Sequence, residues 1–261
     1  MHNNAESTRN RPKIAKLLVK MGKKQFGDPF EPFSYTGVTE ADRLLNDIKN
    51  YPHAFVFGCL MDRQITAERA WMIPYQISQR LGTFRFAKLA QLSQSEITRL
   101  MTIPVPLHRF TKIMSKNLHL AIGMIKKGYG GSAARIWMNR PSSAEVIYRF
   151  LQFPGIGQKI ATMAANLLAR NFKIPFSDYS ALDVSPDVHI RRVFARLGLS
   201  ASSDITSVTY AARALHPEFP GLLDSPIWRI GRNLCKPRNP LCQQCPMRRL
   251  CPTANGKPTD Y

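Results

Sequence analysis

A lysine follows directly on a turn signal in the segment Pro154-Gly155-Ile156-Gly157-Gln158-Lys159. Helix-period apolar residues flank this turn on both sides, so Lys159 is expected in the first turn of a second helix. The positive end of a helix dipole disfavours a cation there. Two glycines before a helix also leave backbone N–H groups free to approach an anion. The pattern indicates either an ordinary tight turn with a surface lysine, or an anion site beside an amine nucleophile.

A carboxylate that could serve such an amine lies in Pro186-Asp187-Val188-His189-Ile190. Asp187 directly precedes an apolar pattern of helical period, so its simplest role is that of an N-cap. Capping and catalysis are compatible, because a helix start holds the carboxylate rigid. Asp178 and Asp183 are nearby competitors, but neither directly precedes such a helix.

Four of the five cysteines lie near the C-terminus, with the spacing Cys235-x6-Cys242-x2-Cys245-x5-Cys251. Two disulfides, a four-thiolate zinc site and an iron–sulfur cluster are the candidates. The rest of the sequence is typical of an intracellular protein, in which thiols stay reduced. Zinc ribbons usually carry two C-x2-C pairs, whereas an iron–sulfur cluster accepts uneven spacing. We therefore expect the cluster, with zinc as the alternative, and we expect Cys59 to be a buried core thiol.

The chain is strongly basic, with 37 Lys and Arg against 17 Asp and Glu and a net charge of +20. Between Leu81 and Arg140 there are ten basic residues and one acid. Such an excess over folded segments favours a polyanion partner, above all nucleic acid. No apolar run is long enough to span a bilayer, and no signal peptide opens the sequence, which argues against a membrane or secreted protein.

Apolar residues recur at helical spacing along most of the chain, and alternating strands are absent, so the sequence predicts an all-α fold. Ser, Thr and Asp precede many of these stretches, and Gly and Pro follow them. The expected helices are 41–49, 53–60, 67–81, 86–92, 96–101, 112–127, 143–153 and one from residue 158.

Taken in this order, these segments resemble the helix-hairpin-helix DNA glycosylases, and most closely the endonuclease III-like branch with its C-terminal [4Fe-4S] loop. The stretch 151–161 is similar to the family's hairpin, with Lys159 at the lysine of its bifunctional members. Residues 186–190 resemble the segment with the essential aspartate, which implies that role for Asp187. The cysteine spacing matches the cluster loop. The resemblance covers roughly residues 41–251.

The resemblance implies a DNA repair enzyme that flips a damaged or mispaired base out of duplex DNA and excises it. Lys159 would attack the sugar and form a Schiff base, which permits strand scission by β-elimination. Asp187 would help to deprotonate the Lys159 amine and would stabilise the positive charge that develops on the sugar. A [4Fe-4S] cluster on Cys235, Cys242, Cys245 and Cys251 and a monomeric state are further implications.

The resemblance also implies a set of DNA-binding residues. Gln64 would reach into the gap left by the flipped base, and the turn 105–108, including His108, would fill that gap or else pack into the core. The hairpin residues expected at the phosphate are Pro154, Gly155, Ile156, Gly157 and Gln158.

Two helical domains flanking a DNA-binding and base-binding cleft are expected. Residues 44–180 would form one domain with the hairpin at 143–170, and residues 1–43 and 181–261 the other, with the cluster loop 235–251. Lys159 and Asp187 are 28 positions apart, about ten more than is usual in the family, so an insertion at about 172–183 is expected to loop out.

Three other functions stay open at this point. A monofunctional glycosylase would use water activated by Asp187, a repair scaffold would bind DNA without base release, and a zinc protein would bind nucleic acid. Oxidised pyrimidines are the favoured lesion, and uracil, mismatched thymine and alkylated or oxidised purines are the alternatives.

Overall fold

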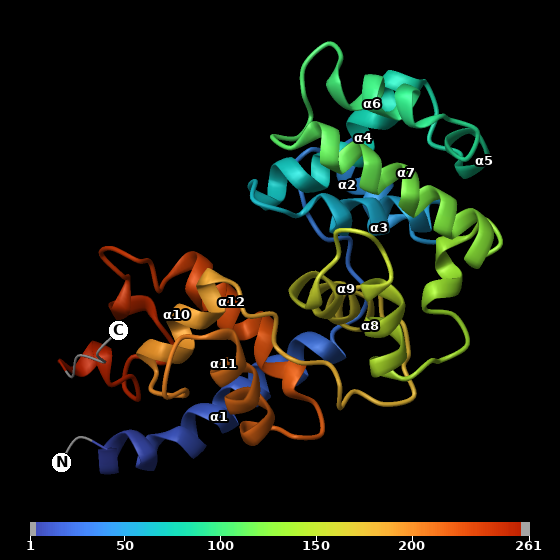
Figure 1. Cartoon of the computed structure of the whole chain (residues 1–261). Coiled ribbons are helices and arrows are strands. Elements are labelled where there is room, and N and C mark those ends of the chain that lie inside the picture. The colour runs from blue at the N-terminus through green and yellow to red at the C-terminus, as the bar shows by residue number, and fades with distance from the viewer. Residues whose placement is uncertain (1–3, 257–261) are drawn as a thin grey trace. The chain divides into compact units, whose positions relative to one another are not determined.

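The computed structural model describes residues 4–256, and this part of the chain is helical with no strand, which confirms the expected all-α class (Figure 1). Within it, no helix is long and apolar enough to cross a membrane. The α-helices are α1 (Asn4–Gly27), α2 (Thr39–Asn46), α3 (Pro52–Met61), α4 (Ala67–Leu81), α5 (Phe86–Leu89), α6 (Gln94–Thr102), α7 (Thr111–Gly128), α8 (Ser143–Leu151), α9 (Gln158–Arg170), α10 (Val188–Arg196), α11 (Ile205–Leu215) and α12 (Asp224–Asn233). Short 3₁₀ turns are η1 (Ala133–Ile136), η2 (Pro220–Leu223), η3 (Cys242–Gln244) and η4 (Thr253–Asn255).

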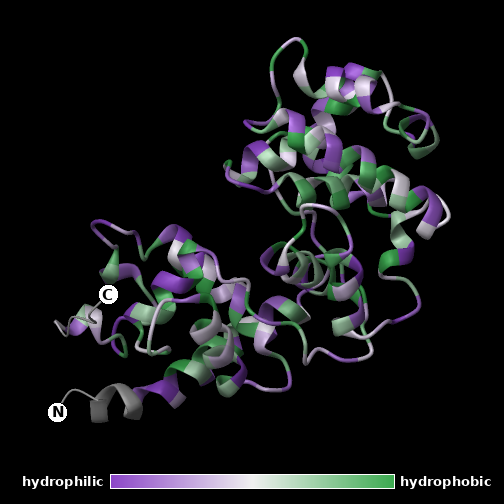
Figure 2. Cartoon of the chain, viewed as in Figure 1, coloured by the Kyte–Doolittle hydropathy of each residue, from purple (hydrophilic) through white to green (hydrophobic). Residues whose placement is uncertain are grey.

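Side-chain caps explain where several of these helices begin. Thr66, Ser142 and Asp204 each accept a hydrogen bond from a backbone N–H in the first turn of α4, α8 and α11. Ser93 and Glu96 form a reciprocal capping box at the start of α6. Such contacts satisfy N–H groups that have no partner inside the helix. In Figure 2 most helices carry both polar and apolar residues, as amphipathic helices do.

The chain divides into two compact units, one formed by residues 30–176 and the other by the segments before and after it. The sequence-based division placed residues 30–43 in the other domain. They belong with the first unit because Asp42 on α2 accepts hydrogen bonds from Tyr35 and Thr36, and α2 packs on α3 and α4.

The 30–176 unit is built around α3, in which all ten residues are buried. A helix that is apolar on every side is stable only inside a core. The ring of Phe55 lies within 5.3–6.4 Å of the rings of Trp71, Trp137, Phe150 and Phe172, measured between centroids. Cys59 is fully buried on the same helix, as expected.

The discontinuous unit has its own core, to which α1, α10, α11 and α12 contribute. Ile14 and Leu18 of α1 are completely buried there beside Phe194 of α10 and Ile227 of α12. Three of the four C-terminal cysteines pack against this cluster. Both ends of the chain are therefore needed to complete one core.

Residues 172–183, which were expected to loop out, contain no helix, and a few buried side chains hold this segment in place. Phe172 and Phe176 are buried in the 30–176 unit. In the other unit, the ring of Tyr179 stacks on Phe219 with centroids 4.8 Å apart, and the Asp183 carboxylate is buried in an ion pair. The added residues contain enough apolar side chains to make burial favourable.

Close packing of α3 on α4 predicts the effect of a single methyl group. A Cβ added to Gly58 would lie 2.4 Å from the Trp71 ring, whereas one added to Gly123 on α7 would meet nothing within 4 Å. Gly58→Ala should lower the free energy of unfolding by about 1–3 kcal/mol through overpacking. Gly123→Ala should raise it by about 0.5–1 kcal/mol through helix propensity. Urea unfolding of both variants checks this, and equal effects would contradict the observed packing.

Candidate functional site

The predicted hairpin is formed by α8, the turn 152–157 and α9. Gly155 lies in the left-handed region with φ +92°, and a Cβ there would approach the Asn117 side-chain amide to 2.4 Å. Only glycine suits this position without strain. Phe153 and Ile156 are buried, and the Ile156 N–H donates to the Phe153 carbonyl at 3.0 Å. The buried side chains of Phe153 and Ile156 therefore hold the turn in a closed conformation.

The N-terminus of α9 faces outward from this turn. Gly157 is its N-cap, and a Cβ added there would have nothing within 4 Å. Gly155, Gly157, Gln158 and Lys159 are all exposed. The first-turn N–H groups and the positive end of the helix dipole thus form a surface on which an anion fits.

Lys159 has an ionic partner that the sequence analysis missed. Its Nζ lies 4.0 Å from Oδ2 of Asp62, and the exposed fractions of the two side chains are 43% and 14%. Asp62 is the C-cap of α3, close to Cys59. Burial, and secondarily the charge of Asp62, raise the pKa of the Cys59 thiol. The only feature of the sequence that could have pointed to this ion pair is the position of Asp62, two residues before Gln64, and that position by itself does not indicate a contact with Lys159.

Gln64 lies in the loop between α3 and α4. Its backbone has φ +54°, and its side chain is exposed. The Gln64 carbonyl accepts a hydrogen bond from Arg109 Nη1 at 3.4 Å. Because Arg109 follows the turn 105–108, that turn and the Gln64 loop are held side by side.

The turn 105–108 is held from α4 by two arginines. Arg80 Nη2 donates to the Val105 carbonyl at 2.8 Å, and Arg69 donates to the carbonyls of Pro106 and Leu107 at 3.4 Å. Val105 is 62% exposed, and Ile103 just before it is 58% exposed. Single exposed apolar residues are common on proteins, so these two are candidates because of their place beside the Gln64 loop.

His108 does not fit the DNA contact expected of it. The side chain is completely buried, and its Nδ1 accepts a hydrogen bond from the Phe110 N–H at 3.0 Å. Burial also lowers the pKa of its imidazole. Of the two interpretations of this residue, packing beneath the turn is the correct one.

Asp187 caps α10, as the sequence predicted. Its Oδ1 accepts from the N–H groups of His189 and Ile190 at 2.8 and 2.9 Å. Its Oδ2 accepts from the indole Nε1 of Trp228 on α12 at 3.1 Å. Three donors hold the carboxylate in one orientation at a half-buried position. Lys159 belongs to the 30–176 unit and Asp187 to the other unit.

The two competing aspartates have structural partners. Asp183 forms a bidentate ion pair with Arg213, with N–O distances of 2.7 and 2.8 Å, and its own side chain is only 7% exposed. Hydrogen bonding to Asp183 raises the pKa of the Arg213 guanidinium. Asp178 accepts hydrogen bonds from Ser180. Asp187 therefore remains the candidate catalytic carboxylate.

Two arginines of α10 fasten the cysteine segment to the helix that Asp187 caps. Arg192 donates to the carbonyls of Cys235 and Gly231, both at 2.8 Å. Arg196 donates to Cys235 Sγ at 3.4 Å and to backbone carbonyls of the loop that follows. The Cys251 thiol in turn donates to the Arg196 carbonyl at 3.3 Å. Arg192 is partly buried, and this burial lowers the pKa of its guanidinium.

The four C-terminal cysteines line one cavity. None of them is in a disulfide, and the other walls include Val193, Leu197, Ile230 and Leu234. Burial raises the pKa of the Cys245 and Cys251 thiols. Four thiols around one apolar space fit an iron–sulfur group, which takes four cysteine ligands.

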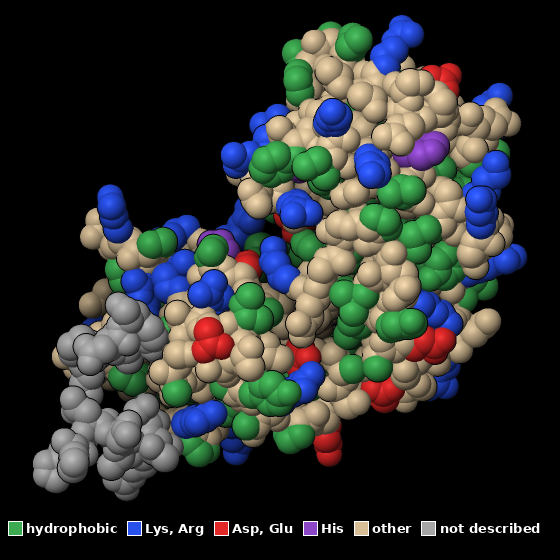
Figure 3. Space-filling model, in the orientation of Figure 1, with side chains coloured by type: hydrophobic (Ala, Val, Ile, Leu, Met, Phe, Trp, Pro, Cys, Tyr) green, Lys and Arg blue, Asp and Glu red, His purple; other side chains and the backbone are tan. Residues whose placement is uncertain are grey.

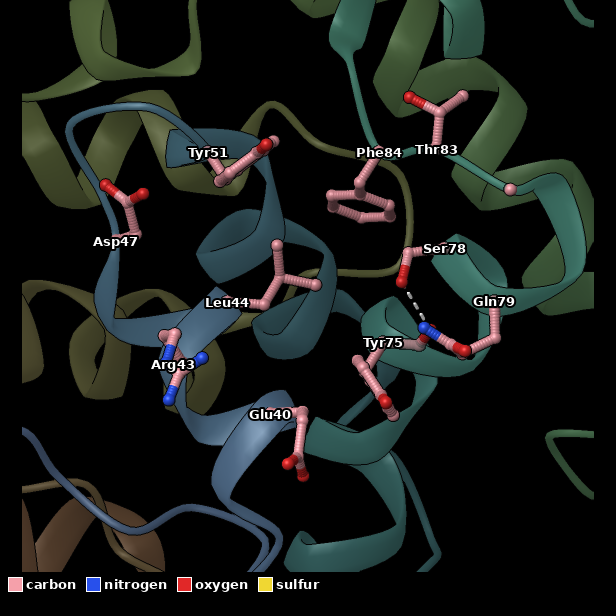
Figure 4. A pocket seen from close by; sticks show the side chains of 11 residues that line it. Glu40, Arg43, Leu44, Asp47, Tyr51, Tyr75, Ser78, Gln79, Thr83 and Phe84 are labelled. Atoms are coloured by element: carbon pink, nitrogen blue, oxygen red, sulfur yellow. Dashed lines mark hydrogen bonds between the residues drawn. The ribbon is translucent and has the colours of Figure 1, made fainter.

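A larger cavity of about 460 Å³ lies in the 30–176 unit, between α2 and the C-terminal end of α4 (Figure 4). Its lining residues include Glu40 and Asp47, and the aromatic residues Tyr51, Tyr75 and Phe84. None of the sequence-predicted site residues is among the residues that line it. The cavity is therefore separate from the hairpin site.

Basic side chains are spread over the face seen in Figure 3. Acidic side chains on this face are fewer and scattered. A surface of this kind attracts a polyanion over a range set by ionic strength.

Comparison with known proteins supports the interpretation of the cysteine segment. Residues 235–251 match the iron-sulfur binding domain of endonuclease III. Endonuclease III of Thermotoga maritima is 34% identical over 112 residues, which cover 42% of this chain and 46% of that protein. The chain is similar to endonuclease III over this part of its length. The match also favours the expected iron–sulfur group over zinc.

Further relatives extend this likeness. Endonuclease III of Synechocystis is 33% identical over 108 residues, 41% of this chain and 45% of that protein. The chain thus spans about half the length of the curated relatives that it matches.

Solved structures share the fold of this chain. The match to a non-covalent endonuclease III–DNA complex has a TM-score of 0.61 at 17% identity. It covers 95% of this chain and 97% of the chain in that structure. A thermostable thymine-DNA glycosylase has a TM-score of 0.60 at 16% identity, covering 95% and 98%. At this identity the likeness establishes the fold alone.

The cysteine segment predicts a coloured protein whose stability depends on iron. Purified protein should be yellow-brown and contain iron and acid-labile sulfide. Cys245→Ser should lose the visible absorption and lower the thermal midpoint, because the segment that packs on α10 loses a crosslink. Cys59→Ser is the control, since it changes a cysteine outside the segment and should retain the colour. Colourless protein containing zinc would contradict the assignment.

Proposed function

We propose that this protein is a DNA glycosylase that excises a damaged or mispaired base from duplex DNA, with Lys159 as an amine nucleophile and associated lyase activity. The observation that carries the proposal is the position of Lys159. Its amine lies at the exposed N-terminus of α9, directly after a glycine turn that packing holds closed. DNA phosphate and a nucleophile would therefore meet at one place.

The hairpin supplies the phosphate contact in this proposal. The open space over Gly157 lets a phosphate oxygen approach the backbone N–H groups at the start of α9. Gly155 and Gln158 complete the contact through the backbone, while Pro154 and the buried Ile156 hold the shape of the turn. The basic surface supplies the sequence-independent part of the affinity.

The loop of Gln64 and the turn after Ile103 supply the gap-filling groups. Both are exposed, and Arg109 holds them side by side. Extruding a nucleotide leaves a hole in the stack that apolar wedges and amide side chains can occupy. Val105 takes the role that the sequence analysis gave to His108, because Val105 protrudes and His108 does not.

The chemistry follows from an amine and a fixed carboxylate serving one extruded nucleotide. The amine of Lys159 attacks C1′, the base leaves with the electrons of the glycosidic bond, and a Schiff base forms that permits β-elimination. Asp187, held by three donors, stabilises the positive charge that develops on the sugar. The unit of residues 30–176 carries the lysine, and the unit formed by both ends of the chain carries the aspartate.

The cysteine segment is proposed to hold a [4Fe-4S] cluster, with about four irons per chain. When bound, this group supplies iron–thiolate bonds that crosslink the last part of the chain. Arg192 and Arg196 then connect the crosslinked segment to the helix capped by Asp187. The Arg238, Arg248 and Arg249 side chains on this segment would face DNA phosphate. Double-stranded DNA is the proposed partner of a monomer, and oxidised pyrimidine is the favoured lesion.

Replacing the nucleophile tests the proposal most directly. Lys159→Gln should abolish borohydride trapping of the protein on a duplex that contains an abasic site, because no amine remains to form the Schiff base. Lys173→Gln is a matched control at a lysine beyond the end of α9 and should trap normally. Undiminished trapping by Lys159→Gln would show that another amine is the nucleophile or that none is used. Base release without strand cleavage would indicate a monofunctional glycosylase.

Replacing the carboxylate tests the role of Asp187. Asp187→Asn should slow single-turnover base excision by about a hundredfold while DNA affinity and the thermal midpoint stay close to those of the parent protein. Asparagine is also a good N-cap, so α10 should still form. Asp183→Asn, by contrast, breaks the ion pair with Arg213 and should lower stability. If Asp183→Asn alone slowed excision, the assignment of Asp187 would be wrong.

A further inference from the structure

The 30–176 unit contains a carboxylate that faces the amine of Lys159 from within the same compact unit. Asp62 Oδ2 lies 4.0 Å from Lys159 Nζ. We propose that Asp62 is the positioning residue of Lys159, which holds the amine before DNA binds and accepts its proton when the nucleotide enters. This inference rests on the proposed function, because it assigns a second carboxylate to the same nucleophile.

The two helix ends that meet here act on the ion pair between Asp62 and Lys159. Lys159 is in the first turn of α9, at the positive end of that helix dipole. Asp62 is the C-cap of α3, at the negative end of another. A cation at a positive end and an anion at a negative end are both disfavoured, so the two dipoles weaken this ion pair and make the lysine easier to release.

The surroundings of Asp62 are more typical of a proton acceptor than of a residue in a surface ion pair. Its side chain is 14% exposed, whereas that of Lys159 is 43% exposed. A mostly buried carboxylate has little water to stabilise its charge and keeps a narrow range of orientations. The Lys159 side chain can leave it and extend outward, since its own end is open to solvent. Entry of DNA that excludes water would strengthen this effect.

The step balances in protons and electrons. The Lys159 ammonium gives one proton to the Asp62 carboxylate, leaving a neutral amine and a carboxylic acid. The amine lone pair then forms the bond to C1′ while the glycosidic bond breaks and its electron pair leaves with the base. Asp62 thus prepares the nucleophile, while Asp187 acts on the charge of the sugar.

The location of Asp62 adds a link to the gap-filling loop. Gln64 is two residues further along the same α3–α4 connection, and its carbonyl is held by Arg109. A displacement of this loop by DNA would move Asp62 relative to Lys159. Insertion of Gln64 into the duplex and release of the amine would then occur together.

The test is the rate of borohydride trapping on a duplex with a preformed abasic site, under single-turnover conditions with saturating protein. Asp62→Asn should lower this rate by about a hundredfold, the usual contribution of a general base. Asp62→Glu keeps the carboxylate and should restore much of the rate. Glu145→Gln is the matched control, because Glu145 forms an exposed ion pair with Arg149 on α8 of the same hairpin. DNA affinity should be equal in all four proteins.

The outcomes separate this inference from the proposed function. A parent rate in Asp62→Asn, together with lost trapping in Lys159→Gln, would overturn the role of Asp62 and leave the nucleophile in place. Retained trapping in Lys159→Gln would overturn the proposed function itself. A slow Asp62→Asn that Asp62→Glu fails to rescue, or whose DNA affinity falls in parallel, would mean that Asp62 only supports the fold.

Discussion

The closed turn at Gly155 fixes where α9 begins, and every role assigned to Lys159 depends on that position. The left-handed backbone and the nearby Asn117 amide leave no room for a side chain. Buried neighbours on both sides of the glycine keep the turn from opening. The amine is therefore presented from a rigid surface, which is the condition for placing a nucleophile within reach of a sugar carbon.

In the other unit, α10 connects two features that are far apart in the sequence. Its first turn is capped by Asp187, and its later turns hold the cysteine segment through Arg192 and Arg196. Trp228 on α12 completes the support of the carboxylate. The cysteine segment and the carboxylate thus share one helix. The structure gives the iron–sulfur segment a mechanical purpose without assigning it any redox role.

Local chemistry made much of this fold predictable from the sequence. The helical period and the caps located α4 and the start of α9, and Asp187 was recognised as a cap because it precedes an apolar stripe. Contacts distant in sequence were not predictable. Asp62 meets Lys159 only because α3 packs beneath the hairpin, and the burial of His108 depends on the path of the whole turn. The burial of Phe172 and Phe176 was likewise missed, because the spacing of two motifs shows that residues are inserted between them but not what those residues contact.

The discontinuity of the second unit has a consequence for synthesis of the chain on the ribosome. Residues 30–176 can complete their core while the C-terminal third is still untranslated, since domains generally fold as they emerge. The first helix cannot, because Ile14 and Leu18 bury themselves against α10, α11 and α12. Its apolar side chains can be buried only after more than half of the polypeptide has been synthesised. In a nascent chain of this protein, α1 therefore exposes apolar side chains that a chaperone could shield until the C-terminal helices have been synthesised.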